Sequence, residues 1–311
     1  MAVFVNTNYS ALQGQRYLGN VQNQLTTTYQ RLSSGMRINS AKDDAAGLQI
    51  ADRLTSQING LNQGNRNASD GIALAQTAEA GMDEISGMLQ KIRTLAVQAN
   101  NGTNTLEDRK ALAKEASSLA TEITRISKQT TFAGKTILNG KQANAFMTAA
   151  AGDAGKTQTL QLQVGSNKGD TISFDLVNLQ FSAIGKGGTV NDDQFKDTAG
   201  TAAFVVKDDV VSVNFSTLGA VQNIIGYMDQ MIGYVDSQRA DLGAIQNRLE
   251  SSIRNQSNVA ANEADARSRI RDADFAEESA NLSQQSIIQQ AAASMLMQAN
   301  TRPQLGLSLL G

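Results

Sequence analysis

Residues 72–99 read IALAQTAEAGMDEISGMLQKIRTLAVQA, and their apolar side chains recur at alternating intervals of three and four. This spacing places a single apolar stripe along an α-helix. The same spacing extends back to Ala51, so we expect one helix from about residue 45 to Asn100. At about 1.5 Å per residue the helix would be roughly 80 Å long, and it must therefore pack against other long helices. The stripe consists of Ala75, Ala78, Met82, Ile85, Leu89, Ile92, Ala96 and Ala99.

Both ends of the chain also have helical spacing. The first end carries a heptad seam with Thr28 as its polar position, in a helix over roughly 5–33 that Ser34-Gly35 should end. The last helix carries one apolar face and is expected to end at Pro303 and Gly306. The first seam consists of Leu18, Val21, Leu25 and Leu32, and the last face of Ile288, Ala291, Ala292, Met295 and Leu296.

Helix-start signals divide the regions between these ends. Ser40 with Asp43 three residues later fits a capping box that would start the long helix, and Thr105 with Asp108 fits a second one. Helical spacing returns at Val221 and continues toward residue 259. The loop between the two capped helices is short, so they should lie antiparallel.

The middle of the chain changes to a period of two. Residues 160–164 and 172–176 alternate between apolar and polar side chains, and the turn residues of 165–169 between them predict a hairpin. A third strand is predicted at Val211, Val213 and Phe215, and an exposed loop at 183–201. The expected fold is mainly α: long antiparallel helices form a rod-like bundle with terminal coiled-coil arms, and a small central β segment makes it α+β overall.

Composition excludes most catalytic chemistry. The 311 residues include no cysteine and no histidine, which removes disulfides, the usual zinc ligands and the commonest general base. Gly134-Lys135-Thr136 lacks the earlier glycine of a phosphate-binding loop, because residue 129 is Gln, and is interpreted as a turn. We therefore predict no enzyme and no catalytic, cofactor-binding or metal-binding residue.

Charge and hydropathy favour neither nucleic acid nor membrane. The net charge is −2, and no apolar run is long enough to span a bilayer. The start of the chain, MAVFVN, lacks the basic region of a cleavable secretory signal. The acidic cluster at 272–278 follows three arginines at 267–271 and is interpreted as a mixed-sign helix surface rather than a cation site.

The terminal helices carry narrow apolar stripes and many Gln and Asn residues. Such a helix buries too little surface alone to offset the entropy of ordering it. We therefore expect the first 40 or so and the last 45 or so residues to be poorly ordered in a free subunit and to become ordered on assembly.

Three long motifs resemble those of bacterial flagellin. Residues 31–48, RLSSGMRINSAKDDAAGL, resemble its N-terminal signature, and residues 89–98, LQKIRTLAVQ, a further segment. Residues 269–277, RIRDADFAE, are similar to its C-terminal signature, and the chain from Leu282 to the final Leu-Leu-Gly fits its tail. The resemblance covers roughly 1–177 and 215–311.

The resemblance implies a structural subunit that self-assembles into the hollow helical filament of the bacterial flagellum, for motility. It implies that 1–44 pairs with 268–311 as a terminal coiled coil lining the inner tube. Residues 45–177 with 215–267 would form the helical rod with its β-hairpin, and 178–214 a short surface insert. The protein would be secreted through the flagellar type III apparatus and would be extracellular.

The resemblance also implies partners. These are other copies of the chain, the filament cap, the hook–filament junction proteins and an export chaperone that grips the C-terminal helices, with no nucleic acid, membrane insertion or cofactor. Many family members are recognised by Toll-like receptor 5, and the contact positions match Leu89, Lys91, Leu95 and Glu115 here. Lys91 stands where Arg is common, and Leu89 lies on the apolar stripe, where a role in the core is the alternative.

Two other functions stay open from the sequence. A hook–filament junction protein shares the terminal coiled coil but would cap the filament rather than extend it. The second is an adhesin or an enzyme carried by the central segment. Some flagellins carry a zinc protease there, but that chemistry needs histidine, which this chain lacks.

Overall fold

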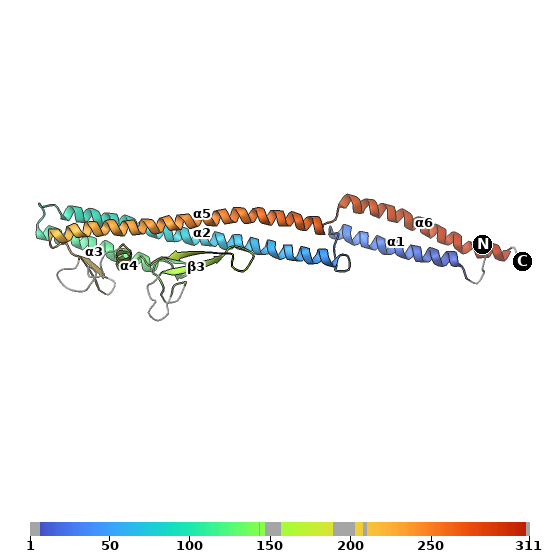
Figure 1. Ribbon diagram of the computed structural model, residues 1–311, viewed down its shortest axis with the longest axis horizontal. Coiled ribbons are helices and arrows are strands. Elements are labelled where there is room, and N and C mark those ends of the chain that lie inside the picture. The colour runs from blue at the N-terminus through green and yellow to red at the C-terminus, as the bar shows by residue number, and fades with distance from the viewer. Residues whose placement is uncertain (1–6, 143, 147–156, 189–202, 208–209, 309–311) are drawn as a thin grey trace. The chain divides into compact units, whose positions relative to one another are not determined.

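The computed structural model describes residues 7–142, 144–146, 157–188, 203–207 and 210–308 (Figure 1). The chain divides into a terminal unit, Met1–Asn59 with Val259–Gly311, and a central unit, Gly60–Asn258. Its long helices are α1 (Tyr9–Ser34), α2 (Ala45–Ala99), α3 (Leu106–Gln129), α5 (Leu218–Arg271) and α6 (Phe275–Ser308). The mainly helical fold with a small β segment is confirmed.

The start of α2 differs from the expected cap. The Asp43 carboxylate accepts hydrogen bonds from the backbone N–H groups of Ser40 (2.9 Å) and Asn39 (3.1 Å), which lower its pKa. This forms a turn rather than a helix, and α2 begins two residues later. Asp44 caps it, because its Oδ1 accepts from the N–H of Gly47 at 2.9 Å. The predicted end of the helix before Asn100 is confirmed.

The second predicted capping box is present at the start of α3. The N–H of Asp108 donates to Thr105 Oγ1 at 3.3 Å, and the N–H of Thr105 donates to Asp108 Oδ2 at 2.9 Å. The hydroxyl of Thr105 also donates to this carboxylate, and this bond, followed by the one from the Thr105 N–H, lowers the pKa of Asp108. Two N–H groups that the helix leaves unpaired are thereby satisfied.

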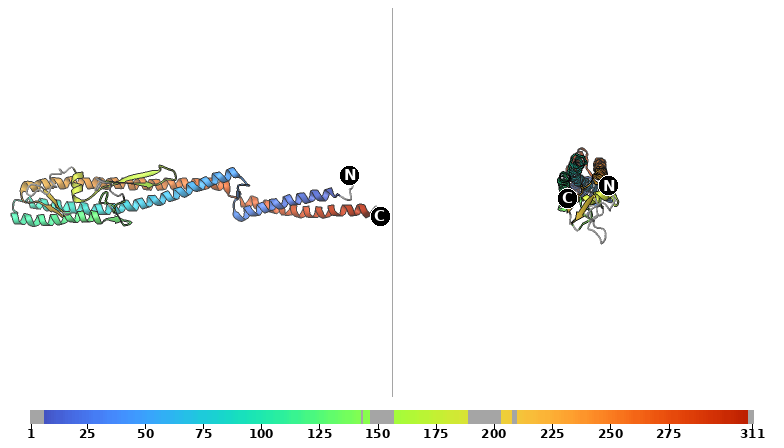
Figure 2. Two further views of the ribbon diagram at one scale, coloured as in Figure 1. Left: turned by 90° about the horizontal axis from the view of Figure 1, so that it is seen from below. Right: turned by 90° about the vertical axis from the view of Figure 1, so that its left-hand side faces the viewer.

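The hydrophobic core lies in the central unit, where α2, α3 and α5 pack with the strands. Every residue of the apolar stripe from Ala75 to Ala99 is buried in it, as predicted. Ion pairs tie α2 to α5 at the surface, namely Arg93–Asp229 at 2.5 Å and Arg239–Asp83 at 3.0 Å. The two helices run side by side through this unit (Figure 2).

The predicted hairpin is formed by β3 (Gln158–Gln163) and β4 (Thr171–Leu176), which pair antiparallel. It lies against α2 at three glycines, Gly60, Gly64 and Gly71. A Cβ at Gly64 would overlap the carbonyl oxygen of Val164, and one at Gly71 would overlap Leu162. Only glycine allows the hairpin to lie this close to the helix backbone.

The described residues of the β segment also form two smaller hairpins. The predicted strand at Val211 and Val213 is β6 (Val210–Val213), which pairs with an unpredicted strand, β5 (Phe204–Lys207). β1 (Thr131–Phe132) and β2 (Lys135–Thr136) flank Ala133 and Gly134, both of which have positive φ. Residues 134–136 therefore belong to a tight hairpin, in agreement with the turn interpretation.

Two further sequence predictions are wrong. The exposed loop expected over 183–201 is in part α4 (Phe181–Gly187), whose Phe181 and Ile184 are buried in the core; residues 189–201 lie outside the described ranges. Helix α6 does not end at Pro303, because the helix continues to Ser308. The loop prediction relied on local composition, whereas packing against the central unit stabilises α4.

Candidate functional site

Helices α1 and α6 pair antiparallel within the terminal unit (Figure 1). Among the described side chains, three hydrogen bonds join them along their length. Asn8 donates to the carbonyl of Ala299 at 2.8 Å, the Thr28 hydroxyl donates to Gln285 Oε1 at 3.1 Å, and Arg31 binds Glu278 at 3.1 Å. The two ends of the sequence therefore form one antiparallel helix pair, which is the candidate surface for assembly.

The predicted seam residues lie on these two helices, with unequal burial. Val21 is buried, and Leu18, Leu25 and Leu32 are half-buried on α1. On α6, Ile288 and Leu296 are half-buried, whereas Met295 is 68% exposed. The polar seam position, Thr28, is buried and hydrogen-bonded to α6. Their role in assembly stays a prediction, but the half-buried positions leave the seam incompletely covered within one subunit.

The connections at the inner ends of α1 and α6 are joined by backbone hydrogen bonds. The N–H groups of Arg37 and Ile38 both donate to the carbonyl of Arg271, at 2.7 and 3.3 Å. The N–H of Ala273 donates to the carbonyl of Gly35 at 3.0 Å. Gly35 ends α1 with a φ of 70°, which glycine adopts without strain. The two linkers thus hold the ends of the helix pair together.

The acidic cluster at 272–278 has local partners. Glu278 pairs with Arg31, Asp272 accepts from the Ser268 hydroxyl, and Asp274 caps α6 through the N–H of Ala276 at 2.8 Å. Among the described residues, no group of three carboxylates is placed to bind a metal ion. Within the same ranges, no helix combines the length and apolar character needed to cross a bilayer.

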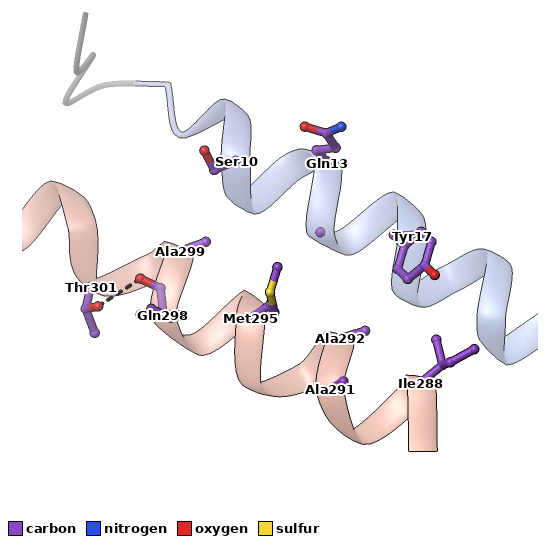
Figure 3. Close-up of a pocket in the computed structure, with 11 residues that line it drawn as sticks. Ser10, Gln13, Tyr17, Ile288, Ala291, Ala292, Met295, Gln298, Ala299 and Thr301 are labelled. Carbon is purple, nitrogen blue, oxygen red and sulfur yellow. Dashed lines mark hydrogen bonds between the residues drawn. The ribbon is translucent and has the colours of Figure 1, made fainter. Parts of the chain in front are cut away.

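A groove of about 930 Å³ lies between α1 and α6 near the chain ends (Figure 3). Met295 projects from α6 toward α1, and Tyr17 lies along the α1 side. Tyr17 is 55% exposed, so neither large side chain is covered by its own subunit. The groove is lined by Ser10, Gln13, Gly14, Tyr17, Ile288, Ala291, Ala292, Met295, Gln298, Ala299 and Thr301.

Apolar exposure concentrates on the same helices. Eight of the fourteen large hydrophobic side chains that are exposed among the described residues lie on α1 or α6. Both hydrophobic core clusters, in contrast, lie wholly within the central unit. The described part of the terminal unit thus has exposed apolar surface but no core cluster of its own. The eight side chains are Tyr9, Leu12, Tyr17, Tyr29, Phe275, Ile287, Met295 and Met297.

The four residues assigned to receptor contact by resemblance divide into two pairs. Leu89 and Leu95 are buried in the core of the central unit. Lys91 on α2 and Glu115 on α3 are exposed and form an ion pair at 3.3 Å. At these positions the surface of the central unit therefore presents the charged pair but not the two leucines.

Sequence reasoning missed Asn8 and Gly14. Asn8 caps α1, since its Oδ1 accepts from the N–H of Ala11 at 3.1 Å, and an Asn directly before a helix is the signal that could have indicated this. Gly14 faces Leu296 so closely that a Cβ would lie 3.3 Å from its Cδ1. No local signal marks this glycine, because its constraint comes from the opposite helix.

Comparisons with known proteins agree with the motifs. The profile of the bacterial flagellin N-terminal helical region matches residues 5–143, and that of the C-terminal helical region matches residues 225–310. The chain is similar to polar flagellin C of Vibrio parahaemolyticus, 36% identical over 383 aligned positions that cover 100% of both chains. It is equally similar to flagellin A of Vibrio cholerae, 36% identical over 378 positions with 100% of both chains covered.

Among solved structures, the fold is similar to that of a flagellar hook-associated protein from Vibrio parahaemolyticus. The TM-score is 0.54 at 16% identity, with 74% of this chain and 100% of that chain covered. At this identity the likeness concerns the arrangement of the helices alone.

Proposed function

The chain belongs to the bacterial flagellin family, and on this premise we propose that helices α1 and α6 are the arms through which its copies join. The chain is a structural subunit rather than an enzyme, and it self-assembles into the extracellular filament of the bacterial flagellum. Contacts that repeat from one copy to the next without closing into a ring generate such an open helical polymer.

One observation carries the assignment of the arms. The terminal unit has most of the exposed large apolar side chains and, over its described residues, no hydrophobic core cluster. Fully burying one such side chain contributes about 1.5–3 kcal/mol, so covering several of them by neighbouring copies is a strong driving force. The central unit, by contrast, contains both hydrophobic core clusters.

Within this assignment, the seam residues of α1 and α6 belong to the inner-tube contacts. We place 1–44 with 268–311 in the terminal coiled coil, 45–177 with 215–267 in the rod, and 178–214 in the insert. The insert also contributes to folding, because Phe181, Ile184 and Phe204 are buried in the core. Decoration of the filament surface is therefore proposed only for the part of the insert outside these residues.

The further partners follow from family membership. They are the filament cap, the hook–filament junction proteins, the flagellar type III apparatus and an export chaperone at the C-terminal helices. A chaperone that bound α6 would cover Ile287 and Met297, which are about two-thirds exposed in the subunit. Toll-like receptor 5 would contact Lys91 and Glu115 first, since these two are exposed.

A direct test replaces apolar side chains on the arms. The double variant Tyr17→Ser, Met295→Ser should raise the subunit concentration needed for polymerisation by at least about tenfold, because each lost burial contributes more than about 1 kcal/mol. Its unfolding transition should stay at the parent value, since both side chains are already exposed. Val210→Ser is the matched control, because Val210 is equally exposed but lies in the central unit. Unchanged polymerisation of the double variant would contradict the assignment of the arms.

Seeded growth separates the filament subunit from a junction protein. Sheared fragments of polymer should elongate when monomer is added at micromolar concentration, and electron micrographs would show longer filaments. A junction protein would instead bind the fragment ends and stop growth.

A further inference from the structure

Pro303 lies inside α6, where a proline is costly. In an α-helix each N–H donates to the carbonyl four residues earlier, so the N–H of residue 303 would serve Ala299. Proline has no N–H, and the carbonyl of Ala299 therefore loses its normal helical donor. A partly buried carbonyl without a donor destabilises the structure.

Asn8, at the other end of the sequence, supplies a donor to this carbonyl. Its Nδ2 donates to the Ala299 oxygen at 2.8 Å, which is a good hydrogen-bond distance. Its Oδ1 simultaneously accepts from the N–H of Ala11 and caps α1. The Ala299 carbonyl needs a donor and the Ala11 N–H needs an acceptor. Together they fix the side-chain amide of Asn8 in a single orientation.

We propose that Asn8 sets the axial register of the α1–α6 pair by replacing the hydrogen bond that Pro303 removes from α6. Pro303 deprives only one carbonyl of α6, that of Ala299, of its helical donor. Only one register of α1 on α6 places Asn8 beside this carbonyl. Sliding either helix by a turn would move Asn8 about 5.4 Å from Ala299 and leave the carbonyl unpaired. The register itself does not depend on the proposed function. Its consequence does rest on that function: the register decides which exposed side chains of the arms meet a neighbouring copy.

A side-chain substitution can separate the two roles of Asn8. Aspartate caps a helix as well as asparagine does, but its carboxylate cannot donate and would repel the carbonyl oxygen. Asn8→Asp should therefore keep α1 and weaken the register. Asn20→Asp is the matched control, since it makes the same change in charge at an exposed position of α1.

The register can be read by a disulfide. The chain has no cysteine, and a Cβ built at Gly14 lies 3.9 Å from the Cβ of Leu296, inside the range of disulfide geometry. The Gly14→Cys, Leu296→Cys variant should therefore form an intramolecular crosslink under mild oxidation. The Gly14→Cys, Gln289→Cys variant is the off-register control, because its second position lies about 10.5 Å along α6.

In dilute protein, we expect one variant to slow the in-register crosslink and a second substitution to restore its rate. Asn8→Asp should lower the rate of the in-register crosslink about tenfold, the effect of losing one hydrogen bond and leaving its partly buried acceptor unpaired. Asn20→Asp should leave the rate unchanged. Pro303→Ala returns the N–H that Ala299 lacks, so adding it to Asn8→Asp should restore the parent rate.

Three results would overturn the inference: no in-register crosslink in the parent pair, an equal rate with Asn8→Asp, or no rescue by Pro303→Ala. The readout needs no polymer, so it stands apart from the proposed function. A chain that crosslinks as expected but never polymerises would contradict the assembly role and leave the register intact.

Discussion

Replacing Gly64 by alanine tests how the β3–β4 hairpin lies on α2. Alanine is favoured over glycine inside a helix by about 1 kcal/mol. At Gly64, however, the new Cβ would overlap the carbonyl oxygen of Val164 and lie 3.1 Å from Gln256 Oε1. The oxygen belongs to the backbone, so the end of the hairpin must lift. Overpacking of this kind costs about 1–3 kcal/mol or more, and we expect a net loss of about 1–2 kcal/mol.

Gly87 provides the opposite case on the same helix. It is exposed, and a Cβ there would meet no atom within 4 Å. Gly87→Ala should therefore stabilise the chain by about 1 kcal/mol. The two variants should differ by about 2–3 kcal/mol in urea unfolding of dilute subunit, followed by circular dichroism. Equal changes of the same sign would refute the claim that the hairpin needs Gly64.

Three further perturbations of the central unit have distinct expected outcomes. Phe204→Ala should cost about 3–5 kcal/mol of unfolding free energy, because its fully buried ring packs edge-on against Phe181 at 5.2 Å; a loss below about 1 kcal/mol in urea unfolding would place it outside the core. Folding lowers the pKa of Asp108 below its ordinary value of 3.8. The stability that this carboxylate gives the folded chain is therefore fully present above pH 3.8 and is lost as the pH falls through the folded-state pKa. Asp108→Asn should therefore lower the melting temperature at neutral pH, and the difference from the parent should shrink in acid; a gap that widened in acid would reverse this sign. Arg93→Ala should lower the stability only slightly, because its pair with Asp229 is exposed, and added salt should reduce the loss further in the same assay.

Much of the helical fold was predictable from sequence because its signals are local. The stripe from Ala75 to Ala99 predicted both the existence and the buried face of α2. The Thr105–Asp108 capping box predicted the start of α3, and alternation predicted β3 and β4 with their antiparallel pairing. Each of these features depends on residues within a few positions of one another.

The features that the sequence did not predict depend on distant partners. α4 contains two glycines among its seven residues and has weak helical propensity, so the burial of Phe181 and Ile184 accounts for it. Pro303 should end a helix, but the chain continues α6 past it with Asn8 serving the freed carbonyl from nearly 300 residues away. Of the candidate site, sequence spacing located the seams of α1 and α6 but could not show that Met295 stays exposed.

Hydrogen exchange measured on dilute subunit and on assembled filament tests the central claim, that the terminal arms depend on neighbouring copies. In the dilute subunit, the α1–α6 pair forms but opens readily, so its amides should exchange faster than those of α2 and α5 in the central unit. In the filament, the arms should gain strong protection and the central unit should change little. Arms as protected in the dilute subunit as in the filament would contradict the account.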